Sequence, residues 1–358
     1  MQYLNALNKI NGVGPQAMKK LLGFFGVAEN AWKASREGLE QSGIGPSLAE
    51  KIMAERGAID PGKEWEKLIR ENIQILTPDN PDYPQLLKEI PSAPFVLYKK
   101  GDLDLNSAPL ISVVGSRKFT TYGHQAATSL VKDLVQAGLI IVSGLALGID
   151  GIAHRAALFS GGKTIAVLGN SLDEKNIAPR SNMDLAREII ENGALLSDYP
   201  VETPAAEFTF PARNRLIAGL SLGTLIIEAG EKSGSLITAN LALEFNREVL
   251  AVPGSIFSSQ SIGTNQLLKK GAKLVMGVKD ILEELNLEES LGQKNILPKV
   301  PGSKEEEILL KILSNEPVHI DNLARISKLG TVSVSTALSM MEIKGWVKDI
   351  GGQNYILL

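Results

Sequence analysis

The chain has 358 residues, a formal net charge of −3, a pI near 5.8, three histidines and no cysteine. Its length allows two or three domains, and 44% hydrophobic with 22% charged residues is typical of a soluble globular protein. The missing cysteines exclude disulfides and thiolate chemistry, and the charge excludes a globally basic nucleic-acid binder but allows a local basic patch.

No apolar run is long enough for a transmembrane helix, and the N-terminus lacks the basic-then-apolar pattern of a signal peptide. With the absence of cysteine, this predicts a cytoplasmic protein that has no membrane partner. The histidines His124, His154 and His319 have no metal-ligand spacing, so we expect no metal site.

Residues 1–77 predict a helical domain with a weak internal repeat. Gly12-Val13-Gly14-Pro15 and Gly43-Ile44-Gly45-Pro46 each precede a helical run, and proline at the first helical position suits a helix start. The repeat resembles a tandem helix–hairpin–helix (SAM-like) domain, a family in which the hairpin amides bind a DNA phosphate. The alternative is a packing domain whose hairpins bind nothing.

Residues 78–105 are rich in proline and predict an ordered connector, which leads into an α/β region at 106–287. Strand and helix patterns alternate there, which indicates a Rossmann-like, doubly wound, mostly parallel sheet. The expected strands are Leu110–Val114, Ile140–Val142, Thr164–Val167, Gly193–Ser197, Thr224–Ile227, Val249–Val252 and Lys273–Met276. Ligands of such sheets bind beyond the carboxyl ends of the strands.

A polar linker at 288–303 precedes a predicted winged-helix domain at 304–358. Its pattern is three helices and a hairpin around Gly351-Gly352, and the expected elements are Glu305–Leu313, Ile320–Ser327, Thr331–Lys344, Trp346–Asp349 and Asn354–Leu357. The third helix carries almost no basic residues and would neutralise few phosphates. We therefore expect a protein-contact or regulatory role for this domain rather than duplex recognition.

Two glycine-rich loops follow predicted strands of the α/β region. Ser143, Gly144 and Gly148 lie in the loop after Ile140–Val142, and Gly115-Ser116-Arg117 follows Leu110–Val114. The order strand, glycine loop, helix brings backbone N–H groups and a helix N-terminus close to a phosphate, and glycine lets the backbone approach. Two such loops in succession predict a surface that binds a phosphate chain.

Arg213 and Arg215 flank an asparagine shortly after two phenylalanines, Phe208 and Phe210. Arginine binds phosphate through two N–H groups at once, and an aromatic ring can stack on a base. The alternative for the arginines is a buried ion pair, and we expect Phe208 to lie in the core. Ser235 opens a later helix with a hydroxyl that can cap the helix or donate to phosphate.

Six ordered blocks between residues 115 and 272 together resemble the DprA/Smf family of bacterial DNA-processing proteins. The blocks are GSR at 115–117, SGLALGID at 143–150, FPARNRLIAGLS at 210–221, SGSLITA at 233–239, VPG at 252–254 and GTNQLLKKGA at 263–272. The flanking modules fit the longer members of that family, so the resemblance covers nearly the whole chain.

The resemblance implies a cofactor-free protein that is no enzyme and that binds single-stranded DNA independently of sequence. Such a protein protects incoming DNA during natural transformation (competence) and promotes loading of the RecA recombinase. Single-strand-binding protein is implied as a further partner. The family also implies a homodimer formed through the Rossmann-like core.

The resemblance places the DNA site at the strand ends. The expected DNA-binding residues are Gly115, Ser116, Arg117, Ser143, Gly144, Gly148, Lys175, Phe210, Arg213, Arg215 and Ser235. Arg180 is expected beside Lys175 at the pocket edge, and Asp150 is expected to orient its loop without touching phosphate. Some relatives have a basic residue where this chain has Glu207, which leaves that contact in question.

Three alternative functions belong to other classes of protein. A nucleotide-binding hydrolase of the lysine-decarboxylase-like phosphoribohydrolase type is suggested faintly by Gly223-Thr224 and Glu228, but the Pro-Gly-Gly loop of those enzymes is missing. An NAD-dependent dehydrogenase is disfavoured because GSRKFTTYG is not G-x-G-x-x-G. The third alternative is an assembly platform whose core holds no DNA.

Overall fold

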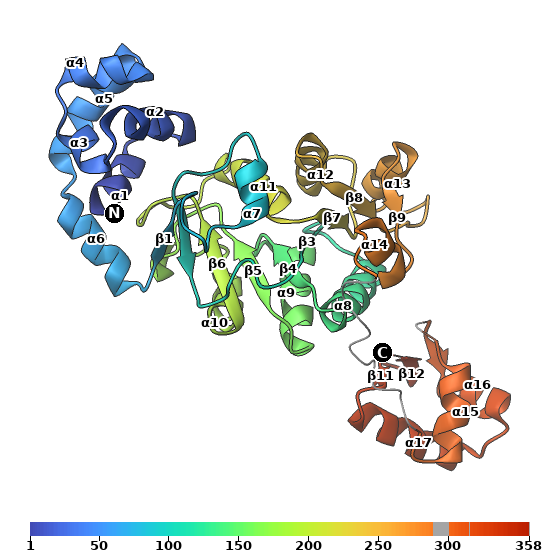
Figure 1. Cartoon of the computed structure of the whole chain (residues 1–358). Helices are drawn as coiled ribbons and strands as arrows, with labels where there is room; N and C mark the ends of the chain where they lie inside the picture. Colours follow the sequence, from blue (N-terminus) through green and yellow to red (C-terminus); the bar gives the residue numbers. More distant parts are fainter. Residues whose placement is uncertain (289–300, 315, 358) are drawn as a thin grey trace. The chain divides into compact units, whose positions relative to one another are not determined.

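The computed structural model describes residues 1–288, 301–314 and 316–357. The chain divides into two compact units, Met1–Gly292 and Gln293–Leu358 (Figure 1). The first unit holds a helical domain and a large mixed sheet, and the second holds the predicted winged helix. Most of the predicted linker, residues 289–300, lies outside the described residues.

The helical domain contains both predicted hairpins. Each has a glycine in the left-handed region, Gly12 at φ 100° in the first and Gly43 at φ 84° in the second, followed by a helix that starts at a proline. The elements are α1 (Gln2–Lys9), α2 (Pro15–Phe25), α3 (Ala28–Lys33), α4 (Arg36–Leu39), η1 (Glu40–Ile44), α5 (Pro46–Glu55), η2 (Arg56–Ala58) and α6 (Pro61–Arg70).

The sheet has nine strands in the order β1-β2-β6-β5-β4-β3-β7-β8-β9. All seven predicted strands are confirmed, with ends shifted by at most two residues. The strands are β1 (Gln74–Leu76), β2 (Leu97–Lys100), β3 (Leu110–Val114), β4 (Ile140–Ser143), β5 (Thr164–Val167), β6 (Gly193–Ser197), β7 (Gly223–Ile226), β8 (Glu248–Ala251) and β9 (Lys273–Leu274).

The expected connector is part of this sheet. Its strand β2 pairs antiparallel with β6 on one side and with β1 on the other, whereas the strands from β6 to β9 are parallel. The sequence analysis found only one short strand pattern in this connector. It could not show that the strand joins the sheet, because a short apolar run pairs with strands that are distant in the chain.

Helices cover both faces of the sheet (Figure 1). The first face carries α8 (Thr121–Gln136), α9 (Ile149–Phe159), α10 (Met183–Asn192) and α14 (Val278–Glu284), and the second carries α7 (Gln85–Glu89), α11 (Thr209–Leu220), α12 (Ser235–Glu244) and α13 (Ile262–Lys269). Alternate residues of a strand serve the two layers: Ile141 packs with α8 and α9, and Ile140 and Val142 pack with α11 and α12. The short helices η3 (Glu174–Asn176) and η4 (Arg180–Asn182) follow β5.

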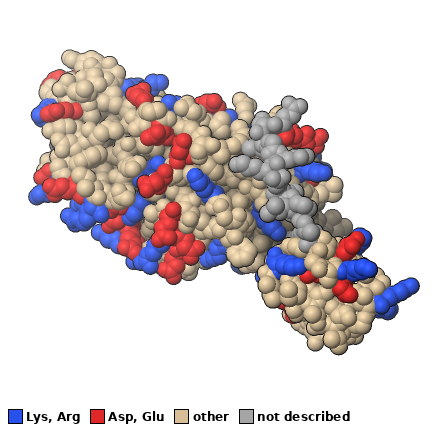
Figure 2. All heavy atoms as spheres, turned by 60° about the horizontal axis from the view of Figure 1, so that its bottom comes forward, with Lys and Arg blue, Asp and Glu red and all other residues tan. Residues whose placement is uncertain are grey.

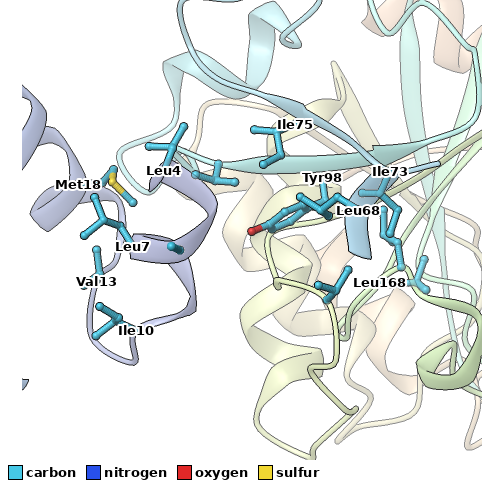
Figure 3. Close-up of a cluster of buried hydrophobic side chains, with 14 of the residues drawn as sticks. Leu4, Leu7, Ile10, Val13, Met18, Leu68, Ile73, Ile75, Tyr98 and Leu168 are labelled. Atoms are coloured by element: carbon cyan, nitrogen blue, oxygen red, sulfur yellow. The ribbon is translucent and has the colours of Figure 1, made fainter. Parts of the chain in front are cut away.

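The helical domain is joined to the sheet through a common hydrophobic cluster. Leu4 and Leu7 of α1 belong to the same cluster as Ile75 of β1 and Tyr98 of β2 (Figure 3). The buried Tyr98 hydroxyl donates a 2.7 Å hydrogen bond to Asn5 Oδ1. Burial of apolar surface on both sides therefore fixes how this domain lies on the sheet.

The second unit is a winged helix with its own hydrophobic core, formed by residues such as Leu309, Leu323 and Leu338. The predicted helices and hairpin are confirmed, and a short strand, β10, adds a third strand to the hairpin. The elements are α15 (Lys304–Ile312), β10 (Val318–His319), α16 (Ile320–Ser327), α17 (Thr331–Ile343), β11 (Val347–Asp349) and β12 (Asn354–Leu357).

No helix in residues 1–288, 301–314 and 316–357 is both long and apolar enough to cross a membrane. Over the same ranges, no group of three histidine, aspartate or glutamate side chains could hold a metal ion.

His154 makes the stability of the core pH-dependent. It is fully buried in α9, its Nδ1 lies 2.7 Å from Thr164 Oγ1, and burial, reinforced by Arg155 and Arg213, lowers its pKa to about 3. An unfolded histidine has a pKa of about 6.5, so below that pH the unfolded chain binds a proton that the folded chain does not. The free energy of unfolding should therefore fall by up to about 1.4 kcal/mol per pH unit from pH 6 toward pH 4.

Urea unfolding at several pH values, followed by circular dichroism, measures this dependence. A His154→Gln variant should unfold with a shallower pH dependence than the parent chain, since glutamine does not titrate. Parallel curves for the two proteins would contradict the assignment.

Candidate nucleic-acid interface

The sheet has a topological switch point between β3 and β7. From β3 the chain proceeds to β4 on one side, while β7 pairs with β3 on the other, with Val114 opposite Ile226. The loops beyond the two strands therefore diverge, which is where ligands bind in doubly wound sheets. They enclose a cavity of about 740 Å³ together with the start of α11 and the start of α12.

Six of the eleven predicted DNA-binding residues line this cavity: Gly115, Ser116, Arg117, Phe210, Arg213 and Ser235. The other lining residues are Val114, Lys118, Ala146, Asp150, Glu207, Pro211, Asn214, Ile217, Gly230, Lys232, Ser233, Gly234, Ile237, Thr238 and Gln260. The tertiary structure thus brings together five segments of the chain, the first at Val114 and the last at Gln260.

The loop after β3 is held by Glu228, which lies two residues beyond the end of β7. The Ser116 N–H donates to the Glu228 carbonyl (2.7 Å), and the Glu228 carboxylate accepts from the N–H and the hydroxyl of Thr120 (2.8 and 2.6 Å). Ser116 Oγ lies 2.7 Å from Gln260 Oε1 and accepts the Lys118 N–H. These bonds fix the loop while Arg117 and Lys118 remain exposed.

Asp150 organises the loop after β4. Its carboxylate accepts the Gly144 N–H (3.2 Å). Burial raises the pKa of Asp150, opposed by the charge of Arg213 and by hydrogen bonds from the backbone of Gly144, Ala146 and Gly115. The loop N–H groups that sequence reasoning assigned to phosphate therefore face an internal carboxylate, and Asp150 has the orienting position expected of it.

Glycine is required in these loops because other parts of the chain approach closely. A Cβ on Gly144 would lie 2.7 Å from Asp150 Oδ2 and 2.8 Å from Arg213 Nη1. Gly148 has a φ of +87°, and a Cβ there would lie 2.4 Å from the Ser116 carbonyl. At these two positions the missing side chain makes room for protein, whereas the sequence suggested room for phosphate.

Arg213 is an internal residue, with only 4% of its surface exposed. Its guanidinium donates to the carbonyls of Gly144 (2.7 Å) and Val167. Burial lowers its pKa to about 10, against the attraction of Asp150, so it stays charged at neutral pH. Arg213 lines the cavity floor and holds the loops after β4 and β5 together.

Arg215 and Ser143 lie outside the cavity. Arg215 forms an ion pair with Asp198 and donates to the Ser92 carbonyl (2.8 Å), which is the buried-pair alternative for this residue. Ser143 is fully buried and donates to the Val113 carbonyl (2.7 Å).

Lys175 lies in a second, shallower pocket together with Arg180. Its Nζ is 3.5 Å from the Glu202 carboxylate. The two residues are together as expected, but they are not among the residues that line the switch-point cavity. Their contact with DNA stays a prediction.

Two phenylalanines at the start of α11 have different environments. Phe210 lines the cavity, and the Arg117 guanidinium lies 5.7 Å from the centre of its ring. The expectation that Phe208 lies in the core is wrong: its side chain is 75% exposed, because Phe208 precedes the first turn of α11 and lies outside the hydrophobic cluster to which that helix contributes.

Three exposed cations surround the cavity: Arg117, Lys118 and Lys232. None of them pairs with a carboxylate in the part of the chain that the structure describes. The sequence analysis did not assign Lys118 and Lys232 to the DNA site. Each follows a predicted strand, Lys118 after β3 and Lys232 after β7, but the sequence did not show that these two strands are neighbours. Elsewhere, on the face in Figure 2, basic side chains lie among acidic ones and form no continuous basic surface.

The fold and the cavity define a class: a Rossmann-like core with a cationic switch-point cavity, joined to a helix–hairpin–helix domain and a winged helix. Two family models match the chain. "DNA recombination-mediator protein A" covers residues 74–286, and "DprA winged helix domain" covers residues 297–353.

Two named relatives match over most of the chain. Protein Smf of Synechocystis is 37% identical over 99% of this chain and 98% of its own length. The DNA processing protein DprA of Bacillus subtilis is 44% identical over 60% of this chain and 72% of its own length. The chain belongs to the DprA/Smf family, which confirms the resemblance seen in its sequence.

Two solved structures of DprA proteins are also similar to this chain. DprA of Streptococcus pneumoniae superposes with a TM-score of 0.70 at 36% identity, covering 79% of this chain and 98% of the other. DprA of Helicobacter pylori, reported in a study of its single-stranded DNA binding mode, gives a TM-score of 0.54 at 33% identity, with 60% of this chain and 95% of the other covered.

Arg213 should be essential for stability, unlike the exposed Arg117. Replacing Arg213 by Gln leaves Asp150 buried without a countercharge and removes a donor from two carbonyls. We expect the free energy of unfolding to fall by about 3 kcal/mol or more. Arg117→Ala should change it by no more than about 0.5 kcal/mol. Urea unfolding of the two variants checks this, and equal stability would contradict the structural role of Arg213.

Proposed function

We propose that this protein binds single-stranded DNA, independently of sequence, in the cavity at the β3–β7 switch point. The observation that carries the proposal is the set of three exposed cations, Arg117, Lys118 and Lys232, on the wall of one cavity, which have no carboxylate partner among the described residues. A cluster of cations without internal carboxylate partners is suited to bind a polyanion. The net charge of −3 confines this affinity to the local site.

Independence of sequence follows from the kind of contact. Phosphate contacts from Arg and Lys carry no base information, and Phe210 beside Arg117 offers a ring on which any base can stack. The reported single-stranded DNA binding of the Helicobacter pylori relative supports this choice of ligand.

We further propose that the protein acts as a recombination mediator in natural transformation, where it protects incoming DNA in the cytoplasm and promotes loading of RecA. Single-strand-binding protein is the second proposed partner. Membership in the DprA/Smf family and the match to a DNA recombination-mediator model support this role.

The proposed function includes no catalysis. The hydrolase alternative needs Glu228 as a reacting carboxylate, but Glu228 is 1% exposed and its two oxygens accept from Thr120. It caps the start of α8 from within the sheet rather than facing the cavity, which favours binding over hydrolysis.

A homodimer through the Rossmann-like core is also proposed. Exposed apolar side chains follow the last two strands of the sheet: Ile256 and Phe257, in the loop after β8, are 82% and 93% exposed, and Met276, just after the edge strand β9, is 81% exposed. Exposed apolar side chains beside the edge of a sheet are typical of a surface that is covered by a partner.

Binding of a fluorescent poly-dT oligonucleotide, compared with a matching duplex across a salt series, tests the function. We expect clear preference for the single strand and an affinity that falls as salt rises, with a log–log slope of about −0.7 per phosphate contacted. No binding at low salt would overturn the proposal and favour the assembly-platform alternative.

Arg117→Ala should weaken binding to poly-dT by roughly 1–3 kcal/mol and reduce the salt slope by about 0.7, the contribution of one charged contact. Lys163→Ala is the matched control, since Lys163 is exposed just before β5, at the amino ends of the parallel strands, whereas the cavity lies beyond their carboxyl ends. Equal affinities of the two folded variants would count against the cavity.

Phe257→Asp should shift the protein from dimer to monomer in sedimentation equilibrium, because a charge in an apolar interface must be desolvated. Phe159→Asp is the control: Phe159 is also 93% exposed but ends α9, away from β9. A dimer that persists in Phe257→Asp, or that is lost equally in both variants, would contradict this surface.

A further inference from the structure

Phe208 is a large apolar side chain for which the fold has no internal use. It is 75% exposed and precedes the first turn of α11. Leaving a phenylalanine in water forgoes the stabilisation that its burial would give. An isolated exposed apolar residue is common, so its local setting decides whether it has a role.

The position of Phe208 is one where helix stability favours a different residue. Phe208 is the N-cap of α11 and makes no side-chain capping bond. Serine, threonine, aspartate and asparagine are preferred at this position because their oxygens accept the free N–H groups of the first turn. A local rule broken without structural gain is typical of a functional position.

The backbone around Phe208 is anchored. Thr209 is buried, and its hydroxyl bonds with both the N–H and the carbonyl of Ala206 (3.1 and 2.8 Å). Phe208 is therefore held in a defined place by its neighbour, and only its ring projects. A pre-positioned ring loses little conformational freedom on binding.

Phe208 lies at the rim of the switch-point cavity. Glu207 and Phe210, on either side of it in sequence, line the cavity, and so does Pro211, its i+3 neighbour along α11. Residues three apart on a helix are neighbours on its surface. The exposed ring thus stands beside the cavity wall that α11 contributes.

The distribution of charge around the cavity favours one orientation of a bound DNA strand. Glu207 is an exposed carboxylate on the α11 side and repels phosphate, whereas Arg117, Lys118 and Lys232 lie on the loops beyond β3 and β7. The phosphates of a strand are therefore drawn to these loops, which turns its bases toward the start of α11.

We propose that Phe208 is a stacking platform for an unpaired base of the bound strand, outside the cavity proper. The inference rests on the proposed function and adds to it a reason for preferring single strands. In a duplex both faces of each base are covered by its stacked neighbours, whereas a single-stranded base has a free face for an aromatic ring. Stacking of this kind is tolerant of sequence because every base has such a face.

The test measures affinity of the full chain for poly-dT and for an oligonucleotide of equal length with abasic sites at its central positions. Phe208→Ala should weaken binding to poly-dT roughly tenfold and leave binding to the abasic oligonucleotide unchanged. Phe208→Trp should retain affinity and show fluorescence quenching on binding, whereas Phe208→Leu, apolar without an aromatic face, should behave like Phe208→Ala. Phe159→Ala, which removes an equally exposed phenylalanine remote from the cavity, is the control.

The outcomes separate the two proposals. If the parent chain fails to bind poly-dT, the proposed function itself fails. If the parent chain binds and Phe208→Ala matches Phe159→Ala, DNA binding stands and the stacking platform is overturned. Equal losses for poly-dT and the abasic oligonucleotide would also overturn it, because the ring would then act without a base.

Discussion

The cavity depends on one buried cation. Arg213 reaches from α11 to the carbonyl of Gly144, just after β4, and to that of Val167, at the end of β5, and its charge balances the buried carboxylate of Asp150. Asp150 in turn holds the N–H of Gly144. A charged pair inside a protein is retained only when its hydrogen bonds are satisfied, and here the carbonyls and N–H groups of the loops satisfy them. The shape of the switch point is therefore set electrostatically.

This arrangement separates structural charge from functional charge. Arg213 and Arg215 are engaged with internal partners, and the loop N–H groups face Asp150, so neither supplies the main attraction for a polyanion. That attraction comes from exposed side chains that the fixed loops present, Arg117 and Lys118 beyond β3 and Lys232 beyond β7. Exposed cations on loops that are held by internal hydrogen bonds suit a ligand that is bound by its backbone and not by its sequence.

The two flanking modules are integrated to different degrees. The helical domain shares one hydrophobic cluster with the sheet and adds a polar contact, Tyr98 to Asn5, within it. The winged helix has a separate core, and its helix α17 exposes uncharged residues such as Val332 and Ile343. The scarcity of basic residues on α17 supports the expectation that this unit contacts protein rather than duplex DNA.

The sequence by itself determined the order of strands and helices, the hairpins of the helical domain and the family, because these depend on local periodicity, on glycine and proline positions and on contiguous motifs. It could not determine which charged residues are internal. Arg213 and Lys232 carry the same charge, but Arg213 is buried beneath the cavity and Lys232 is exposed on its wall. Nor did it show that Phe208 is exposed or that residues 74–100 extend the sheet. Burial and pairing depend on segments that are distant in the chain, and only the tertiary structure brings those segments together.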